Sequence, residues 1–207
     1  MRDEALVVRA RAEYNGCIVT DSEIHYSDPV DLELQPLNSD GFILDIGGGG
    51  EGMVGRLNGS RVVSIDTRME ELLEAPDGPL KIQMDATDLQ FPDATFGGAA
   101  AFFSMMYIDS AEDHQRVLGE AFRVLVNGGL LHIWDAEIAG KSGSPKPAYA
   151  IQLRCSVNHR IVTAAYGVAW PKETRDAAYY RMAAENAGFR HLETDVVENV
   201  FHMVLRK

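Results

Sequence analysis

The feature that most constrains the fold is the run of residues 42–52, where an apolar stretch leads directly into glycines. Residues 42–46 have the pattern of a buried strand, and glycines follow at 47–50 and at 52, before an amphipathic stretch. Glycine can turn through positive φ and lets a ligand lie against the main chain, while the N–H groups that begin the next helix point at it. The run therefore predicts a strand, a tight turn and a helix that together bind a nucleotide.

The glycine turn alone leaves two kinds of nucleotide open. Gly47, Gly49 and Gly52 satisfy the G-x-G-x-x-G spacing of dinucleotide-binding folds. In such a site the glycines receive a pyrophosphate, which Asp45 at the end of the preceding strand would repel. S-adenosylmethionine instead carries an ammonium and a sulfonium, and a carboxylate attracts both. Asp45 therefore favours S-adenosylmethionine.

A second acid ends the next expected strand. Residues 61–66 form a β-branched run that closes on Asp66, as in the second parallel strand of a βαβ unit. A carboxylate at this point accepts hydrogen bonds from the two ribose hydroxyls, a role expected about 20 residues after the glycine turn in either nucleotide class. Asp66 therefore predicts a ribose site and leaves the identity of the nucleotide open.

Over about residues 42–135 the chain resembles the class I S-adenosylmethionine-dependent methyltransferases, and the type 11 methyltransferases in particular. The motifs occur in the family's order: D-x-G-x-G, an acid closing strand two, a D-[AV] step after strand three, an approach to strand four similar to L-P-F-x-D-x-S-F-D, and a V-L-x-P-G-G entry to strand five. Here they are Asp45–Gly49, Asp66, Asp85-Ala86, Leu89–Gly97 and residues 124–129. Two departures are Glu51, where the family usually has glycine, and Gly97, where it usually has aspartate.

The resemblance also implies roles for the cofactor-binding residues. Asp45 would help to hold the methionine ammonium, Asp66 would take the ribose, and Asp85 with Ala86 would read the adenine. The chemistry of Asp85 agrees, because the adenine N6 group offers donors that a carboxylate accepts. The residues implied for the cofactor site are Asp45, Gly47, Gly48, Gly49, Asp66, Thr67, Arg68, Asp85, Ala86, Phe103 and Ser104.

The fold implied by the resemblance is a doubly wound, Rossmann-like α/β sheet of seven strands, the last of them antiparallel. Two alternating segments after the fifth strand, joined around Asn158-His159, predict an inserted β-hairpin. A capping box at Ser110 predicts the start of a helix. The other expected elements are the fifth strand at 130–134, a helix at 173–187, and a terminal antiparallel pair at 189–196 and 200–206.

We expect a single methyltransferase domain over residues 1–207. Tyr14, Ile24, His25 and Tyr26 of its first segment would be available to cover the pocket. The parts are a helical or irregular N-terminal cap at 1–40, a cofactor-binding core at 41–135, the inserted hairpin at 140–171, and a terminal helix with a strand pair at 172–207.

Composition narrows the range of partners. The net charge of −12 and the scattered 19 basic residues argue against a nucleic-acid substrate, whose phosphates need Lys and Arg. No apolar run is long enough to span a bilayer and no signal-peptide pattern opens the sequence, so we expect a cytoplasmic protein without membrane contact. Cys17 and Cys155 suggest neither a disulfide framework nor a metal cluster. Asp109, Asp135 and Glu137 are too scattered for us to expect a metal.

Methyl transfer depends chiefly on positioning, because the sulfonium leaves as a neutral thioether. A base is needed only if the acceptor must lose a proton, and the candidates are Tyr107, His114 and Asp135. We expect His114 to be exposed or to cap its helix.

The favoured function is methylation of a small molecule, and the alternatives are a non-catalytic S-adenosylmethionine-binding module and a nicotinamide-dependent oxidoreductase.

The acceptor site is expected outside the nucleotide-binding core. We expect the hairpin, together with the segment before Asp40, to close over the methyl group and select the acceptor. Tyr166 and Trp170 share one face of an alternating strand. That face would either line the pocket or pair with a second subunit in a homodimer.

Overall fold

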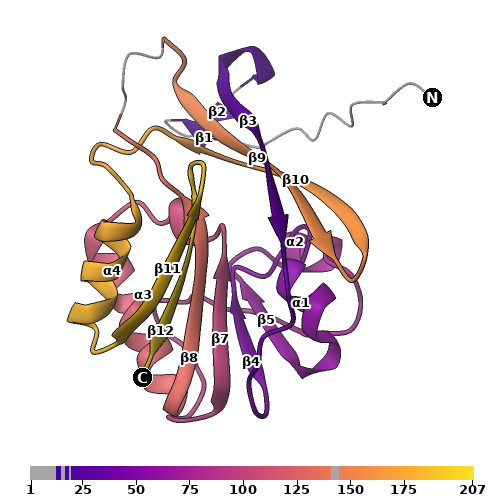
Figure 1. The fold of residues 1–207 in the computed structure, drawn as a ribbon, viewed down its shortest axis with the longest axis vertical. Coiled ribbons are helices and arrows are strands. Elements are labelled where there is room, and N and C mark those ends of the chain that lie inside the picture. The colour runs from indigo at the N-terminus through magenta and orange to yellow at the C-terminus, as the bar shows by residue number, and fades with distance from the viewer. Residues whose placement is uncertain (1–12, 15–16, 19, 141–144) are drawn as a thin grey trace.

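The computed structural model describes residues 13–14, 17–18, 20–140 and 145–207. A seven-stranded sheet lies at its centre, in the order β11-β12-β8-β7-β4-β5-β6 (Figure 1). The strands are β4 (Ile43–Ile46), β5 (Val62–Asp66), β6 (Leu80–Gln83), β7 (Phe96–Phe102), β8 (Leu125–Ala136), β11 (Arg190–Val197) and β12 (Val200–Arg206).

The strand directions confirm the predicted topology. β4 pairs in parallel with β5 and β7, and the parallel pairing continues to β6 on one side and β8 on the other. β12 runs antiparallel to both of its neighbours, β8 and β11. The sheet is therefore doubly wound, and the carboxyl ends of its parallel strands share one edge.

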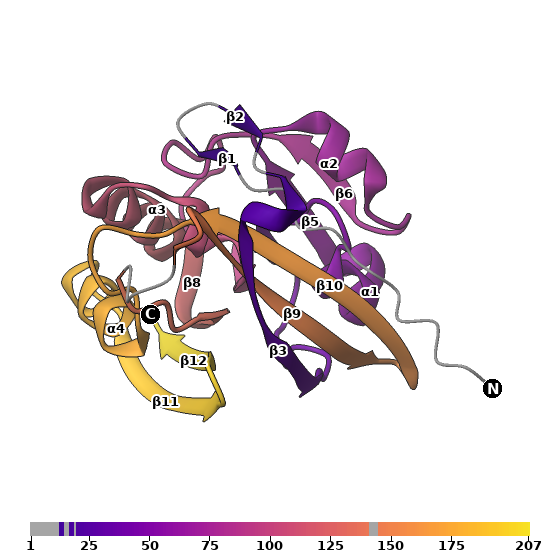
Figure 2. The same cartoon turned by 90° about the horizontal axis from the view of Figure 1, so that it is seen from above.

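The helices are short, and they cover the two faces of the sheet unequally (Figure 2). Helices α3 and α4 enclose one face around an apolar core that includes Leu44, Ile65 and Ile133. Helix α1 and a second, smaller sheet cover the other face around Ile43 and Val62. The helices are α1 (Met53–Asn58), α2 (Met69–Glu74), α3 (Ala111–Val124) and α4 (Ala177–Asn186), with 3-10 turns η1 (Asp21–Glu23), η2 (Gly59–Arg61) and η3 (Met105–Tyr107).

Local signals explain where these elements begin. Ser110 caps α3 as predicted, because its hydroxyl accepts a hydrogen bond of 2.9 Å from the Asp113 N–H. The prediction that the last helix begins at residue 173 is wrong, since α4 begins after Asp176, whose carboxylate accepts from the Tyr179 N–H at 2.8 Å. The fifth strand begins at Leu125 rather than at Leu130, and Gly128, at φ 83°, lies within it.

The predicted hairpin is confirmed as β9 (Ala148–Val157) and β10 (Arg160–Ala169). Its two turn residues, Asn158 and His159, both have positive φ, as the tight turns that match strand twist require. Alternate residues of both strands face the core of the molecule, among them Ile151, Leu153 and Ala164.

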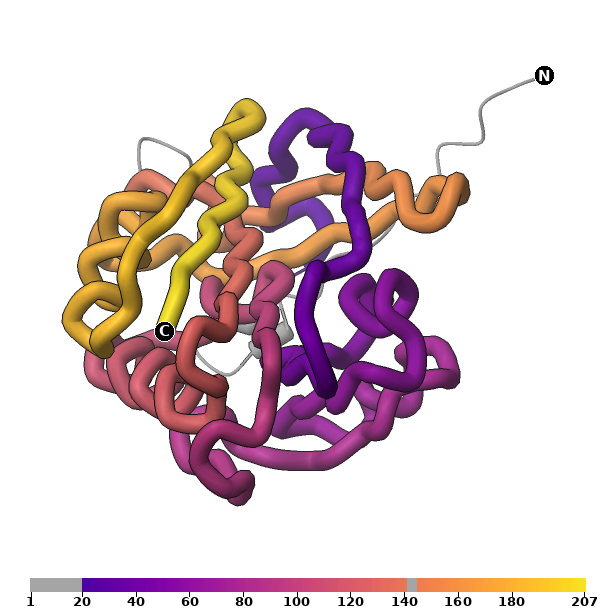
Figure 3. The backbone as a smooth tube through the Cα atoms, turned by 60° about the horizontal axis from the view of Figure 1, so that its bottom comes forward, coloured from indigo at the N-terminus to yellow at the C-terminus, as the bar shows by residue number. Residues whose placement is uncertain are grey.

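The expectation of a helical or irregular cap before Asp40 is wrong, because the segment contains the ten-residue strand β3 (Ile24–Glu33). β3 pairs in parallel with β9, so that the second sheet has the order β10-β9-β3 (Figures 1 and 3). Its alternation is interrupted at Asp28-Pro29, where the register shifts because proline has no N–H for the ladder. Within the described residues β1 (Glu13–Tyr14) and β2 (Cys17–Ile18) also pair, but the side chains of Tyr14 and Cys17 lie outside the described part.

Gly97 occupies the position where the family usually has aspartate, and the structure gives the reason. A Cβ atom at Gly97 would lie 1.6 Å from the Asp40 carbonyl oxygen, because the segment that leads into β4 crosses directly over β7. The Gly97 N–H donates to the Phe42 carbonyl oxygen at 3.0 Å. A side chain at this position is thus excluded by the path of the N-terminal segment.

No helix in the described part of the chain is both long and apolar enough to cross a bilayer.

Candidate functional site

The carboxyl ends of β4, β5, β6 and β7 bring the predicted cofactor residues to one edge of the sheet. Asp45 lies near the end of β4 and the glycine turn follows it, while Asp66 ends β5. Asp85 follows β6, and Phe103 with Ser104 follow β7. This is the edge at which parallel α/β sheets bind their ligands.

The glycine turn is shaped by close contacts with neighbouring strands. The N–H groups of Gly47 and Gly48 both donate to the Ile65 carbonyl oxygen at 2.9 Å. A Cβ atom at Gly47 would lie 2.4 Å from the Ser104 Cβ, and one at Gly49 would lie 2.9 Å from an Asp66 carboxylate oxygen. The missing side chains therefore let the turn sit between the tips of β5 and β7.

Asp45 lies beneath the turn and is only 1% exposed. Its Oδ2 accepts a hydrogen bond of 3.0 Å from the Ser64 hydroxyl, and a Cβ atom at Gly48 would lie 2.3 Å from the same oxygen. Burial raises the pKa of Asp45 to about 7. The carboxylate is thus held under the main chain, so that its influence on a ligand above the turn is through its charge.

Asp66, Thr67 and Arg68 lie together at the end of β5. The Asp66 Oδ1 accepts from the Arg68 N–H at 3.0 Å, and the Thr67 carbonyl accepts from the Gln83 side chain at 2.8 Å. Arg68 forms an ion pair of 2.9 Å with Glu71. Asp66 is half-buried and lies beside the glycine turn, so that part of the residue remains exposed there.

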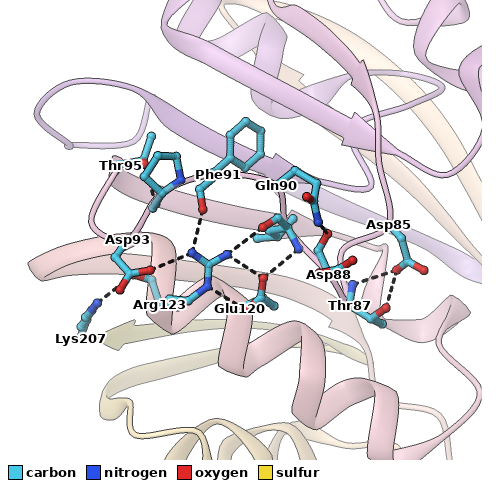
Figure 4. Close-up of polar contacts among 12 residues, drawn as sticks. Asp85, Thr87, Asp88, Gln90, Phe91, Asp93, Thr95, Glu120, Arg123 and Lys207 are labelled. Carbon is cyan, nitrogen blue, oxygen red and sulfur yellow. Dashed lines mark hydrogen bonds and ion pairs between the residues drawn. The ribbon is translucent and has the colours of Figure 1, made fainter.

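Asp85 and Ala86 begin a loop that helix α3 holds firmly (Figure 4). The Asp85 Oδ1 accepts from the N–H and the hydroxyl of Thr87, each at 2.8 Å. The Arg123 guanidinium donates to the carbonyl oxygens of Leu89 and Phe91 at 2.8 and 2.7 Å, and it pairs with Asp93 and Glu120. The sequence did not single out Arg123, because a helix arginine three residues after a glutamate is typical of a solvated ion pair.

Phe103 and Ser104 follow β7 directly, and their side chains contact the neighbouring strands β4 and β10. The Ser104 hydroxyl donates to the Ile46 carbonyl oxygen at 2.6 Å and so joins the tips of β4 and β7. Phe103 has a φ of 49°, which is rare for a residue with a side chain. Its ring stacks on that of Tyr166 in β10, with 5.1 Å between centroids and 8° between planes. Tyr166 therefore packs against the segment after β7 within its own chain.

Tyr107 and Glu51 both lie near the hairpin strand β10. The Tyr107 hydroxyl lies near the main chain of Gly167, and the Tyr166 hydroxyl lies near the Glu51 carboxylate. Burial raises the pKa of the half-buried Glu51, whereas Tyr107 is exposed. The hairpin thus lies near both the glycine turn and the segment after β7.

His114 and Asp135, the other two candidate bases, lie behind Tyr107 and are fully buried. The Asp135 carboxylate accepts from the N–H groups of Met106 and Ala136 at 2.9 and 2.8 Å, and burial raises its pKa to about 7. His114 Nε2 donates to the Met105 carbonyl oxygen at 3.0 Å, and burial lowers its pKa. The expectation that His114 is exposed or caps its helix is wrong.

Arg175 completes this network, and no sequence signal marked it. Its guanidinium donates to the carbonyl oxygens of Ile108 and Asp109 at 3.2 and 2.7 Å and lies 3.0 Å from His114 Nδ1. Asp135, His114 and Arg175 therefore hold successive residues of the segment 105–109, which carries Tyr107.

A cavity of about 480 Å³ lies elsewhere, at the amino ends of the parallel strands. Residues 38–41, Gly97, residues 126–130 and Arg206 are among those that line it. It lies at the edge of the sheet opposite to the predicted cofactor residues.

Within the described residues no group of three or more His, Cys, Asp or Glu side chains is placed to hold a metal ion.

Comparison with known proteins agrees with this arrangement. Residues 44–133 match the family described as the methyltransferase domain. No curated protein matches the sequence.

Several solved structures share the fold at low identity. An S-adenosylmethionine-dependent methyltransferase from Methanosarcina mazei is 18% identical with a TM-score of 0.59, over 85% of this chain and 99% of that one. A similar enzyme from Mesorhizobium loti is 16% identical with a TM-score of 0.57, over 83% and 94%. The [4+2]-cyclase SpnF is 19% identical with a TM-score of 0.59, over 84% and 77%.

Proposed function

Because residues 44–133 match the methyltransferase-domain family, we propose that the chain is a class I S-adenosylmethionine-dependent methyltransferase and that it methylates a small molecule held between the glycine turn and the hairpin. S-adenosylmethionine is the methyl donor of this family and is therefore its cofactor. The observation that carries the proposal is the meeting of Asp66, Asp85 and the glycine turn at one sheet edge, where Gly47 lies against Ser104 and the neighbouring Phe103 stacks on the hairpin.

The residues at this edge fit the cofactor by their chemistry. Asp66 and Asp85 offer acceptors for ribose hydroxyls and for the adenine amino group, and Thr67, Arg68 and Ala86 flank them. The glycine turn gives main chain without side chains beside Asp66. The acids Asp45, Asp66 and Glu51 favour a ligand with positive charge over a pyrophosphate. The same acids weigh against the alternative of a nicotinamide-dependent oxidoreductase.

The acceptor would bind under the second sheet. The exposed Tyr107 and the half-buried Tyr166 supply aromatic rings and hydroxyl groups near the glycine turn, and the buried Phe103 stacks on Tyr166 and supports it. The strand β3 supports the hairpin from the other side through its pairing with β9. The net charge of −12 supports a small acceptor rather than a nucleic acid.

In the proposed reaction the cofactor supplies an electrophilic methyl group, and the protein supplies position. We propose that Tyr107 touches the acceptor, because it is 49% exposed at this edge. His114 and Asp135 are proposed as positioning residues, because both are fully buried and engaged with the segment before Tyr107. A cytoplasmic location is part of the proposal, and the buried free thiol of Cys155 is consistent with a reducing compartment.

A second candidate is a protein that binds S-adenosylmethionine without methyl transfer. Two observations favour it: neither His114 nor Asp135 is exposed at the site, and the similar structure of SpnF is described as a cyclase. The fold therefore does not decide the reaction.

Calorimetry and turnover separate these candidates. We expect binding of S-adenosylmethionine and S-adenosylhomocysteine and none of NAD, and release of labelled methyl groups onto a component of a metabolite extract. Asp66→Ala should lose roughly 1.5 to 3 kcal/mol of cofactor binding, as expected for hydrogen bonds to a charged group. Stabilisation by NAD alone would overturn the cofactor, and cofactor binding without any methylated product would favour the non-catalytic candidate.

A further inference from the structure

Phe103 is the one buried residue among the five non-glycine residues of the described part that have positive φ. The other four are exposed and lie in turns: Ala94, Asn158, His159 and Glu198. Phe103 is 1% exposed, directly follows β7 and has a φ of 49°. Positive φ in a bulky residue costs free energy, and it persists only where the surroundings hold it. The conformation of Phe103 therefore depends on its contacts.

Two contacts hold the main chain and the ring of Phe103. Its N–H donates to the Trp134 carbonyl oxygen at 2.8 Å. Its ring lies flat on that of Tyr166 in β10, with 5.1 Å between the centroids and 8° between the planes, and such stacked pairs are favourable beyond the area they bury. The ring of Phe102 meets both rings edge-on, at 5.0 and 6.2 Å. The stacking contact thus comes from the hairpin, which lies outside the cofactor-binding core.

The bend of the chain at Phe103 places Ser104 against the glycine turn. The Ser104 hydroxyl donates to the Ile46 carbonyl oxygen at 2.6 Å, and the Ser104 Cβ would lie 2.4 Å from a Cβ atom at Gly47. The φ of a residue sets the direction of the chain that follows it, because the peptide planes themselves are rigid. A change of φ at Phe103 would therefore move Ser104 and release its contacts with the start of the glycine turn.

We propose that Tyr166 is a positioning residue of the cofactor site: its ring holds Phe103 at positive φ and thereby keeps Ser104 against the glycine turn. The inference rests on the proposed function, since the site is that of S-adenosylmethionine. It makes the affinity for the cofactor depend on the hairpin, which is the proposed wall of the acceptor site. By linkage, an acceptor that presses β10 onto Phe103 tightens cofactor binding, and the bound cofactor favours the acceptor in the same measure.

The hairpin has other anchors, so that Tyr166 can be changed without releasing it. β9 pairs with β10 on one side and with β3 on the other. The Asn158 side chain in the hairpin turn donates to the Arg56 carbonyl oxygen at 2.8 Å. Loss of the Tyr166 ring should therefore act on Phe103 rather than on the position of the whole hairpin.

Calorimetry with S-adenosylhomocysteine, which has no methyl group to transfer, tests the inference. Tyr166→Leu keeps an apolar side chain but cannot stack, and it should weaken binding roughly tenfold, or by about 1.4 kcal/mol. Phe103→Leu removes the same stack from the other side and keeps the cost of positive φ, so it should weaken binding by a similar factor. Tyr166→Phe keeps the ring and should retain the affinity of the wild-type protein.

A double-mutant cycle shows whether Tyr166 acts through Phe103. In Phe103→Gly the positive φ carries no steric cost and no ring remains to stack on. Adding Tyr166→Leu to this variant should therefore change the affinity no further. An equal effect of Tyr166→Leu with and without the Phe103 ring would overturn the inference.

The matched control is Tyr149→Leu, because Tyr149 lies on the same face of the hairpin but its ring contacts are with His25 and Trp170. It should leave the affinity unchanged, and an equal loss there would overturn the inference, because general loosening of the hairpin would then be the cause. Unchanged affinity in Tyr166→Leu or in Phe103→Leu would overturn it as well. Failure of the wild-type protein to bind S-adenosylhomocysteine would instead overturn the proposed function, and the inference with it.

Discussion

Replacing Asp45 by asparagine should make the protein more stable at neutral and alkaline pH. Asparagine has the same shape and keeps an oxygen that accepts from the Ser64 hydroxyl, now 3.0 Å from Asp45 Oδ2. It removes a charge whose burial is almost complete, since Asp45 is 1% exposed. The variant therefore isolates the free energy of ionising this one buried acid.

The magnitude follows from the pKa of Asp45, which burial raises from 3.8 to about 7. Between these values the folded protein holds a proton that the unfolded chain releases, so stability falls as pH rises through this range. The difference corresponds to about 4 kcal/mol at pH 8, because each pKa unit is worth about 1.4 kcal/mol. Asp135, whose pKa burial also raises to about 7, contributes a fall of the same sign in both proteins.

The assay is equilibrium unfolding in urea, followed by tryptophan fluorescence, at several pH values from 4 to 8. The free energies of unfolding of the wild-type protein and Asp45→Asn should coincide at pH 4 and diverge steadily above it, with the variant more stable. A difference that does not change with pH would refute the reasoning, because it would show that Asp45 titrates normally in the folded protein. A variant that is less stable at pH 8 would show that the ionised carboxylate is stabilised by a partner.

Three further predictions follow from the packing and the polar networks. Gly97→Ala should lower the free energy of unfolding in urea by roughly 1 to 3 kcal/mol, because its Cβ would lie 1.6 Å from the Asp40 carbonyl oxygen. The control Gly119→Ala, which has open space around it in α3, should raise that free energy by up to about 1 kcal/mol. Arg123→Gln should speed the hydrogen exchange of the Leu89 and Thr95 amide protons and weaken cofactor binding several-fold, roughly as expected for lost charged hydrogen bonds. Unchanged exchange would show that α3 does not hold the loop. Arg175→Ala should raise the pKa of Asp135 further, because the charge of Arg175 lowers that pKa in the wild-type protein. The loss of stability with rising pH should then extend to higher pH. An unchanged dependence of the free energy of unfolding on pH would contradict this prediction.

Most of the cofactor edge was predictable because its signals are local. The glycine turn and the acids follow apolar runs directly in the chain, so the positions of Asp45, Asp66 and Asp85 at strand ends can be inferred from neighbouring residues alone. The hairpin was predictable for the same reason, since alternation and the Asn158-His159 turn lie within one short stretch.

The misplaced elements depend on partners far away in sequence. β3 lacks a continuous alternation because Asp28-Pro29 interrupts it, and only β9 makes it a strand. His114 is a polar residue near a helix start, where the pattern favours exposure, yet Met105 and Arg175 satisfy both of its ring nitrogens in the interior. Arg175 itself lies outside every motif, so only the folded arrangement reveals its contacts with residues 108 and 109.

The parallel pairing of β3 with β9 has a consequence for the order of folding. Asp31 and Arg154, which form an ion pair across these strands, are 123 positions apart. Closing so long a loop costs chain entropy before any contact repays it, and contacts of this range form slowly. During synthesis β3 emerges first and must wait until the whole nucleotide-binding core and then the hairpin have followed. We therefore expect the second sheet, one wall of the proposed acceptor site, to close only after that core has taken shape.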